Sequence, residues 1–274
     1  LKKLNIIKGN IEDPFFMNKN LKGFDIVFHL ASLIGIPYSY VSPINYIRTN
    51  VEGAINICEA ARAHKFRLVH TSTSETYGTA MYEPINETHP LQGQSPYSAS
   101  KIAADKVIES YVNSFNINAV TVRPFNVYGP RQSARAIIPT IISQILFNNK
   151  IEVGNIEPIR DFTFVSDTVN GFLMAGINST IGEVFNLGSG KSISVLELIK
   201  MCQSKLDKEN LDINSNSERV RPKKSEVYKL ICDYEHAKNI LGWKPDISLS
   251  EGLDQTIDFI SKNESFYKIN KYEI

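Results

Sequence analysis

Short apolar runs alternate with helix-like stretches through the first 180 residues, and this alternation most restricts the fold that the chain can adopt. The runs have the length and composition of strands, and the stretches between them repeat apolar residues at helical spacing. Strands separated by amphipathic helices are typical of βαβ units, whose strands pair in parallel. The sequence therefore predicts an α/β fold with a doubly wound parallel sheet, whose strands include LNIIKG, DIVFHLA, RLVHTST and AVTVRP.

The pattern changes after residue 130, which predicts a second, smaller α/β lobe. There GPRQSARAIIPTIISQIL and SVLELIKMCQSKL read as helices, IGEVFNLGSG reads as a strand and turn, and Ser250 is the expected cap of a closing helix. We expect the first domain to span residues 1–130 plus about 160–180. The smaller lobe would take residues from about 131 to 159 and from 181 to 274.

Charge and composition exclude several classes of protein. Thirty basic and 29 acidic residues give a formal net charge of +1, so the chain has no general attraction to nucleic acid or to an anionic membrane. No apolar run approaches the roughly 18 residues of a membrane span. The three cysteines form no C-x-x-C pair, which argues against a disulfide framework and against a zinc site. We expect a cytoplasmic protein without a bound metal.

Hydroxyl and carboxylate side chains follow one of the predicted strands directly. Thr73, Ser74 and Glu75 come immediately after the run from Arg67 to Ser72. In an open parallel sheet, ligands bind at the carboxyl ends of the strands. Turn capping by the hydroxyls and a solvated carboxylate are the alternative explanation, and the position at the sheet edge favours a functional site.

A tyrosine and a lysine follow within thirty residues. Ser95 and Pro96 predict a helix start, because serine caps free amides and proline is tolerated at the first helical position. Tyr97 and Lys101 then lie one turn apart on the same helix face. Tyrosine ordinarily titrates near pH 10, and a neighbouring ammonium group lowers that pKa. Two other pairs, Tyr234 with Lys238 and Tyr267 with Lys271, share this spacing and read as surface helix pairs. The nearby strand end with Thr73 and Glu75 favours Tyr97 as the tyrosine that acts as a base.

Nine motifs follow one another along nearly the whole chain: FHLAS, NVEGAINICEAAR, TSTSETYG, YSASK, RPFNVYGPRQ, RDFTFVSD, FNLGSG, RPKKSEV and LGWKP. In this order they resemble the extended short-chain dehydrogenase/reductase superfamily of nucleotide-sugar epimerases and dehydratases. The resemblance implies a Rossmann-like doubly wound sheet, a smaller substrate-binding lobe, NAD or NADP as cofactor, and a nucleotide-sugar substrate.

Within this superfamily, the glutamate of TSE resembles the 4,6-dehydratases, since 4-epimerases usually lack it. The stretches HPLQGQSPYSASKIAADK and YGPRQSARAIIPTII are most similar to the nucleotide-activated N-acetylglucosamine 4,6-dehydratases of bacterial legionaminic acid biosynthesis. RPKKSEV also resembles a segment of GDP-mannose 4,6-dehydratases. Whether the nucleotide is GDP or UDP stays open.

The resemblance implies an internal redox cycle on the sugar. Tyr97, supported by Lys101, would take the proton of the 4-hydroxyl as hydride leaves C4, while Thr73 hydrogen-bonds the same oxygen. Glu75 would then remove the C5 proton, water would leave from C6, and the hydride would return to C6. Ser74 stands where the dTDP-glucose branch has an aspartate and where the GDP-mannose type has serine.

The resemblance also implies contacts with the two ligands. For the cofactor they are Asn10 and Ile11 beside the adenine, Leu30, Ala31 and Ser32 on the nicotinamide side, and Lys101 on the ribose. For the substrate they are Asn126 and Asn186 along the nucleotide sugar, Arg160 and Arg221 at the diphosphate, Arg135 at the base or phosphates, and Glu226 at the ribose.

The glycine-rich turn that opens this superfamily has no counterpart in the sequence. We therefore expect the first βαβ segment to be missing, the choice between NAD and NADP to be unreadable, and this fragment to be inactive or unstable. A 4-epimerase, a UDP-glucuronate decarboxylase and a non-catalytic binding module are the alternative functions. Members of the family commonly pair, so a homodimer or a higher homo-oligomer is expected.

Overall fold

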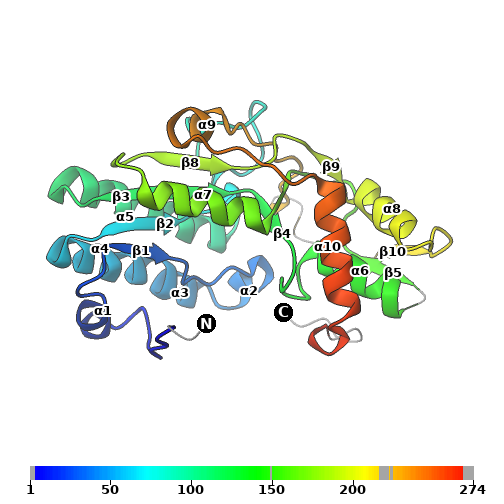
Figure 1. Cartoon of the computed structure of the whole chain (residues 1–274), viewed down its shortest axis with the longest axis horizontal. Coiled ribbons are helices and arrows are strands. Elements are labelled where there is room, and N and C mark those ends of the chain that lie inside the picture. Colours follow the sequence, from blue (N-terminus) through cyan, green and yellow to red (C-terminus); the bar gives the residue numbers. More distant parts are fainter. Residues whose placement is uncertain (1–3, 149, 216–221, 223–224, 268–274) are drawn as a thin grey trace.

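The computed structural model describes residues 4–148, 150–215, 222 and 225–267. Its helices, shown in Figure 1, are α1 Pro14–Asn20, α2 Ile36–Val41, α3 Pro43–Tyr46, α4 Gly53–His64, α5 Pro96–Phe115, α6 Ile137–Phe147, α7 Val165–Ile177, α8 Val195–Lys205, α9 Glu235–Leu241 and α10 Leu249–Ser261. Shorter turns of π- or 3₁₀-helix are η1 Ile47–Glu52, η2 Ser74–Tyr77 and η5 Glu264–Phe266.

The strands form one central sheet and several two-stranded pairs. β1 Ile26–His29, β2 Arg67–Thr71, β3 Ala119–Pro124 and β8 Val184–Leu187 lie in the order β1-β2-β3-β8, and all of them are parallel. The predicted α/β fold with a parallel sheet is confirmed. The paired strands are β4 Asn126–Tyr128 with β7 Phe162–Phe164, β5 Ile151–Val153 with β10 Ile213–Ser215, and β6 Ile159–Arg160 with β9 Ile193–Ser194.

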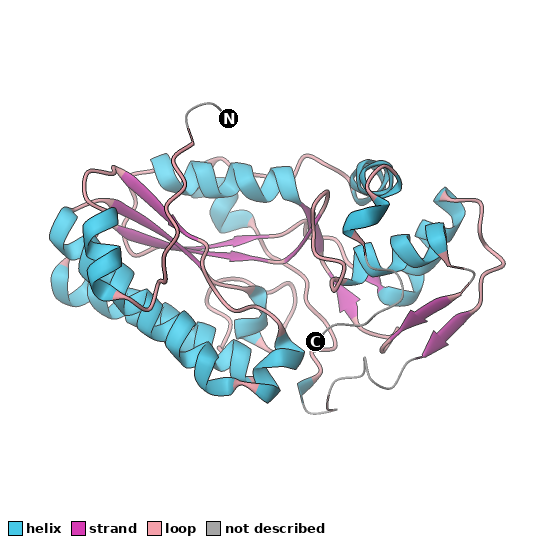
Figure 2. Ribbon diagram, turned by 90° about the horizontal axis from the view of Figure 1, so that it is seen from below, coloured by secondary structure: helices cyan, strands magenta, loops and turns pink. Residues whose placement is uncertain are grey.

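Helices cover both faces of the central sheet (Figure 2). On β2, Leu68 packs in a core cluster with residues of α4 and α5, while the next residue, Val69, packs in another cluster with α7 and β8. Successive side chains of a strand point to opposite faces, so an apolar run such as RLVHT suits a strand that is buried on both sides.

A separate core cluster fills the other end of the molecule, to the right in Figure 1. It joins α6, α8 and α10 with β5 and β7, and its buried side chains include Ile141, Leu198 and Leu253. The predicted helices for this region are confirmed as α6 and α8. The division into two domains stays a proposal.

One part of the predicted division is wrong. β8 lies within residues 181–274, which the sequence pattern placed in the smaller lobe, yet it pairs with β3 in the central sheet. Trp243, which follows α9, packs on the same sheet against Val122 and Leu187. Pairing with β8 satisfies the second edge of β3, and this long-range requirement leaves no mark in the local sequence.

Two local predictions are also wrong. The run LNIIKG forms no strand: residues 4–10 are exposed coil, and among the described residues β1 has a strand neighbour on one side only. A strand needs a hydrogen-bonding partner, whatever its composition. The cap of α10 is Ser248 rather than Ser250, since Ser248 Oγ accepts a hydrogen bond from the Glu251 amide at 3.2 Å.

The three cysteines are buried free thiols in three different core clusters. Cys58 packs between α4 and the sheet, Cys202 in the smaller lobe, and Cys232 beside Tyr77 and Phe125. Burial raises the pKa of Cys58 and of Cys202 to about 12. These thiols are therefore protonated at neutral pH.

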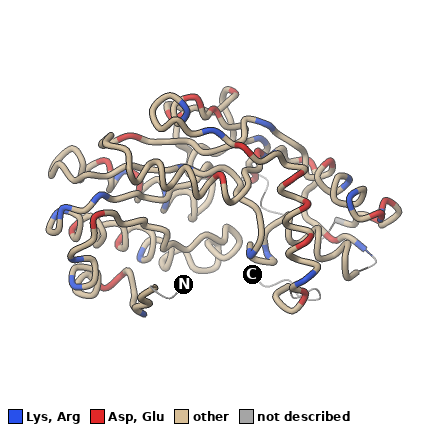
Figure 3. Tube along the Cα trace, in the orientation of Figure 1, with Lys and Arg blue, Asp and Glu red and all other residues tan. Residues whose placement is uncertain are grey.

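Charged side chains of both signs are interspersed along the chain (Figure 3), in line with the formal net charge of +1. Across the described ranges, no helix combines the length and the apolar character that crossing a membrane requires.

Candidate active site

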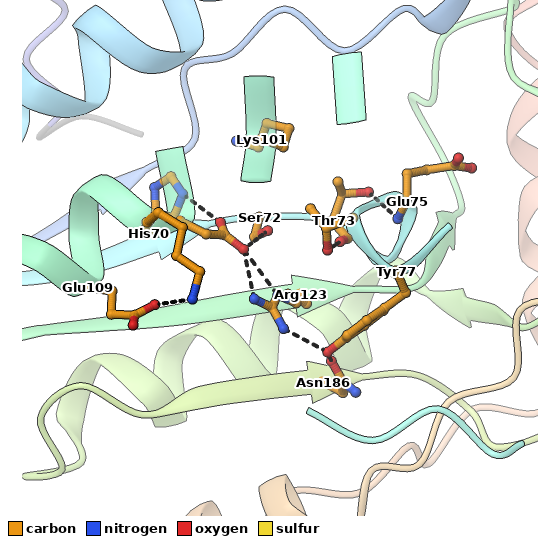
Figure 4. Close-up of polar contacts among 12 residues, drawn as sticks. His70, Ser72, Thr73, Glu75, Tyr77, Lys101, Glu109, Arg123 and Asn186 are labelled. Atoms are coloured by element: carbon orange, nitrogen blue, oxygen red, sulfur yellow. Dashed lines mark hydrogen bonds and ion pairs between the residues drawn. The ribbon is translucent and has the colours of Figure 1, made fainter. Parts of the chain in front are cut away.

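The end of β2 turns sharply and brings polar groups to the carboxyl edge of the sheet (Figure 4). The Ser72 amide continues the pairing with β3 by donating to Val122 O at 2.7 Å. Thr73 then caps the short helix η2: its Oγ1 accepts from the Glu75 amide at 3.3 Å, and its carbonyl accepts from Thr76 Oγ1 at 2.7 Å. The Thr73 hydroxyl thus has a structural task, and the same cap fixes the backbone of Glu75.

Helix α5 begins as its sequence predicts. Ser95 and Ser98 form a reciprocal capping box, with Ser98 N donating to Ser95 Oγ at 3.1 Å and Ser95 N donating to Ser98 Oγ at 2.9 Å. Pro96 occupies the first helical position. This start places Tyr97 and Lys101 on one face, where both are buried.

Tyr97 lies in a small apolar cluster with Ile36 and Tyr46, whose ring meets it edge-on at a centroid distance of 6.2 Å. Burial raises the pKa of Tyr97, a hydrogen bond with the Thr73 side chain lowers it, and the Glu75 carboxylate raises it again. The structure therefore brings three of the predicted catalytic residues together. Ser74 is buried in the same turn.

Lys101 is buried on α5, one helical turn after Tyr97. Its Nζ donates to the carbonyl of Thr71 at 2.6 Å, and burial lowers its pKa to about 8 although the charge of Asp105 acts in the opposite direction. The role of Lys101, which together with a cationic nicotinamide would lower the pKa of Tyr97, stays a prediction. Burial disfavours the tyrosinate more than the favourable contacts stabilise it, so the net shift of Tyr97 is upward.

The sequence reasoning missed a buried polar network directly behind these residues. Asp105 Oδ2 accepts hydrogen bonds from Ser72 Oγ at 2.8 Å and from Arg123 Nε and Nη2 at 3.1 and 2.9 Å. His70 Nε2 lies 3.3 Å from Asp105 Oδ1, and His70 Nδ1 lies 3.1 Å from His29 Nδ1. The signal was present in the sequence, because Asp105 follows Lys101 by four residues, which places it on the same helix face.

Asn186 belongs to the far end of this network and not to a ligand site. Its Oδ1 accepts from the Tyr77 hydroxyl at 2.7 Å, and its Nδ2 donates to Ile85 O at 3.1 Å. Arg123 Nη1 donates to the same Tyr77 oxygen at 2.9 Å (Figure 4). The side chain is fully buried, so the predicted contact of Asn186 with a nucleotide sugar is wrong.

Four other predicted substrate residues line one cavity of about 350 Å³: Asn126, Arg135, Arg160 and Glu226. Arg160 Nη2 lies 3.2 Å from Glu226 Oε1, and both side chains are almost buried. Asn126 Nδ2 donates to Asp161 O at 3.2 Å, while Arg135 is exposed at the rim. Arg221, the second predicted diphosphate ligand, lies outside the described residues.

Helix α2 connects the cavity to the tyrosine. Ile36 packs against Tyr97, and the next residue, Pro37, lines the cavity. Tyr40 also lies on α2, and its hydroxyl is 2.5 Å from the hydroxyl of Ser225. Ser225 directly precedes Glu226 in the chain.

The predicted cofactor residues form two groups. Leu30 and Ala31 are exposed directly after β1, and Ser32 Oγ donates to Asn50 Oδ1 at 2.9 Å. Asn10 is exposed and its Oδ1 accepts from the Glu12 amide at 3.0 Å, whereas Ile11 packs beside α4 and its carbonyl accepts from Asn56 Nδ2. The structure places the first group at the carboxyl edge of the sheet.

A family model described as GDP-mannose 4,6 dehydratase matches residues 1–256. The chain belongs to this family. A dTDP-D-glucose 4,6-dehydratase from Homo sapiens is 30% identical over 94% of this chain and 75% of its own length.

Solved structures agree with the family. A dTDP-glucose 4,6-dehydratase from Bacillus anthracis in complex with NAD superposes with a TM-score of 0.86 at 25% identity, covering 97% of this chain and 82% of that one. A UDP-glucose 4-epimerase from Thermotoga maritima with UDP-glucose gives a TM-score of 0.88 at 28% identity, covering 96% and 88%. The Rossmann-like fold is thereby shown, and the chain belongs with nucleotide-sugar dehydratases and epimerases.

Proposed function

We propose that the protein is a nucleotide-sugar 4,6-dehydratase that converts GDP- or UDP-N-acetylglucosamine to the 4-keto-6-deoxy sugar. The observation that carries this proposal is the position of Glu75. The cap of η2 holds Glu75 beside Thr73, and its carboxylate acts electrostatically on the hydroxyl of Tyr97. A dehydratase requires a base for the C5 proton next to the tyrosine that serves C4, and an epimerase does not.

The residues divide the chemistry among them. Tyr97 takes the proton of the sugar 4-hydroxyl while Thr73 hydrogen-bonds that oxygen. The ketone at C4 acidifies the hydrogen on C5, and Glu75 removes this proton as the C5–C6 double bond forms. Glu75 then passes its proton to the hydroxyl that leaves C6 as water. When hydrogen returns to C6, the proton that Tyr97 took from the 4-hydroxyl is returned to C5, which restores the base. Ser74 is buried in the same turn.

The carboxyl edge of the sheet fits the nicotinamide end of NAD. Leu30 is 63% exposed beside the strand end, and in the described part of the chain the buried hydroxyl of Thr71 has no hydrogen-bond partner. Leu30, Ala31, Ser32 and Lys101 would hold that end of the cofactor. When bound, NAD supplies the redox chemistry, taking up hydrogen from C4 and returning it at C6.

The cavity suits the nucleotide diphosphate. Arg135 and Arg160 supply permanent positive charge and forked donors, which match phosphate oxygens. Asn126 and Glu226 add an amide and a carboxylate on the same wall. The acetamido sugar and a place in legionaminic acid biosynthesis are proposed on the similarity of residues 89–106 and 128–142 to such enzymes.

A product assay tests the proposal. The protein expressed from its natural gene is supplied with NAD and incubated separately with GDP- and UDP-N-acetylglucosamine, GDP-mannose, dTDP-glucose and UDP-glucuronate, and the products are weighed by mass spectrometry. We expect loss of one water from an acetamido sugar. Glu75→Gln should abolish this loss, and Glu109→Gln, which changes an exposed carboxylate of α5, should leave it intact.

A 4-epimerase is the second candidate, favoured by the 28% identity to the UDP-glucose 4-epimerase from Thermotoga maritima. Its product has the mass of its substrate, so chromatographic separation of the two sugars identifies it. Loss of carbon dioxide from UDP-glucuronate would point to a decarboxylase. Binding of a nucleotide sugar without any product would point to a non-catalytic module.

A further inference from the structure

Three ionisable residues follow one another along a single face of α5. Tyr97, Lys101 and Asp105 are spaced by four residues, and all three are buried, with exposed fractions of 7%, 3% and 5%. Residues four apart are neighbours on a helix surface. The Asp105 carboxylate is therefore the next group along the face from the Lys101 ammonium, on the side away from Tyr97.

Asp105 also ties α5 to the end of β2. Its Oδ2 accepts from Ser72 Oγ at 2.8 Å, and Ser72 directly precedes Thr73, the residue that caps η2. Arg123 on β3 donates two hydrogen bonds to the same oxygen. One carboxylate thus links the helix that carries Tyr97 to the turn that carries Glu75.

The ionisable groups around Lys101 come from four elements, β1, β2, β3 and α5. Burial lowers the pKa of His29 on β1 and of His70 on β2, so both rings are neutral at pH 7. Burial raises the pKa of Asp105, but the contact with His70, the charge of Arg123 and the hydrogen bond from Ser72 outweigh it and hold that pKa below the ordinary value. Asp105 is therefore ionised, and His70 Nε2 lies 3.3 Å from its Oδ1.

We propose that Asp105 is a positioning residue: it fixes α5 against the end of β2 and keeps the Lys101 ammonium protonated beside Tyr97. The role in the reaction rests on the proposed function, whereas the interaction between Asp105 and Lys101 does not. An amine without this carboxylate would lose its proton at lower pH, and the site would lose the positive charge next to the tyrosine.

Nuclear magnetic resonance tests the interaction without any substrate. The side-chain ¹⁵N resonance of Lys101, assigned by comparison with Lys101→Arg, is titrated in the wild type, in Asp105→Asn and in Ser72→Ala. We expect Asp105→Asn to lower the midpoint by about one pH unit or more, which is about a tenfold change in proton affinity. Ser72→Ala removes one hydrogen bond and keeps the charge, so its midpoint should stay near that of the wild type. Equal midpoints in wild type and Asp105→Asn would overturn the proposal.

Asp105→Asn leaves the buried Arg123 without its carboxylate partner and therefore risks misfolding. The wild type then supplies the test: the ¹³Cγ resonance of Asp105 should shift with the same midpoint as Lys101, and an Asp105 signal that ignores the lysine titration contradicts the proposal.

Turnover separates positioning from plain structural support. In Asp105→Asn the alkaline limb of the pH profile should move to lower pH together with the lysine midpoint. A uniform loss of rate with an unmoved limb would show that Asp105 only supports the fold. If no substrate reacts even in the wild type, the proposed function fails, and the resonance titrations still decide the interaction.

Discussion

At the scale of single residues, the titration of Lys101 sets a pH dependence that differs between activity and stability. Its pKa of about 8 lies below the ordinary value of about 10.4, because burial disfavours the ammonium. We expect activity to fall as the pH rises through about 8, since the positive charge beside Tyr97 is then lost. Initial rates measured across this range check the prediction.

The stability contribution of the same lysine runs the other way. Between pH 8 and about 10.4 the unfolded chain binds more protons at this residue than the folded chain does, so the group makes folding more favourable as the pH rises. Chemical denaturation at pH 8 and pH 9 on wild type and on Lys101→Met isolates this contribution. Loss of activity that coincides with unfolding would contradict the assignment to Lys101.

At the scale of elements, the start of α10 offers a matched pair of serines. Ser248 and Glu251 form a capping box, whereas Ser250 is exposed within the first turn. Ser248→Ala should lower the free energy of unfolding by about 0.5–2 kcal/mol, and Ser250→Ala should change it by less than about 0.5 kcal/mol. Urea denaturation of both variants decides which serine is the cap, and equal effects would reject the capping box.

Elements with local causes could be predicted from the sequence, and elements with distant partners could not. The start of α5 follows from Ser95 and Pro96 alone, and the S-x-x-E pattern at residue 248 would have located the cap of α10. The strand predicted for LNIIKG does not form, because a strand depends on a hydrogen-bonding neighbour. The ligand contact predicted for Asn186 was wrong, because the sequence does not show which side chains of β8 point inward to Tyr77.

The candidate site follows the same division. The position of Thr73, Glu75, Tyr97 and Lys101 around one strand end could be predicted, since the short stretch directly after β2 and the start of α5 carry all four. The roles assigned to them stay predictions. The support from Arg123 could not be predicted, because it reaches Asp105 from a third element, β3.

At the scale of the whole molecule, the cavity lies where the two ends of the fold meet. Pro37 comes from α2, whose Ile36 shares a core cluster with Tyr97 of α5, whereas Val195 begins α8 and belongs to the core cluster of α6, α8 and α10. Uridine diphosphate should therefore raise the melting temperature, with a stabilisation of about 2.7 kcal/mol when its concentration is a hundredfold above its dissociation constant. Thermal denaturation with and without the nucleotide measures this effect.

Charge at the rim provides the control for that measurement. Arg135→Gln should reduce the stabilisation by uridine diphosphate, because the variant removes an exposed cation of the cavity. Lys244→Gln removes an equally exposed cation that does not line the cavity and should leave the stabilisation unchanged. Equal losses in both variants would indicate a general charge effect instead of a binding site.

The three buried thiols can serve as probes of local opening in three parts of the core. Cys58, Cys202 and Cys232 lie in different core clusters, so each one reacts with an alkylating reagent only when its own region opens. Labelling rates measured for each cysteine-containing peptide would then show whether the sheet and the region of α6, α8 and α10 open separately or together. If a bound nucleotide slows the labelling of Cys58 and of Cys202 by the same factor, the two regions open together in the complex.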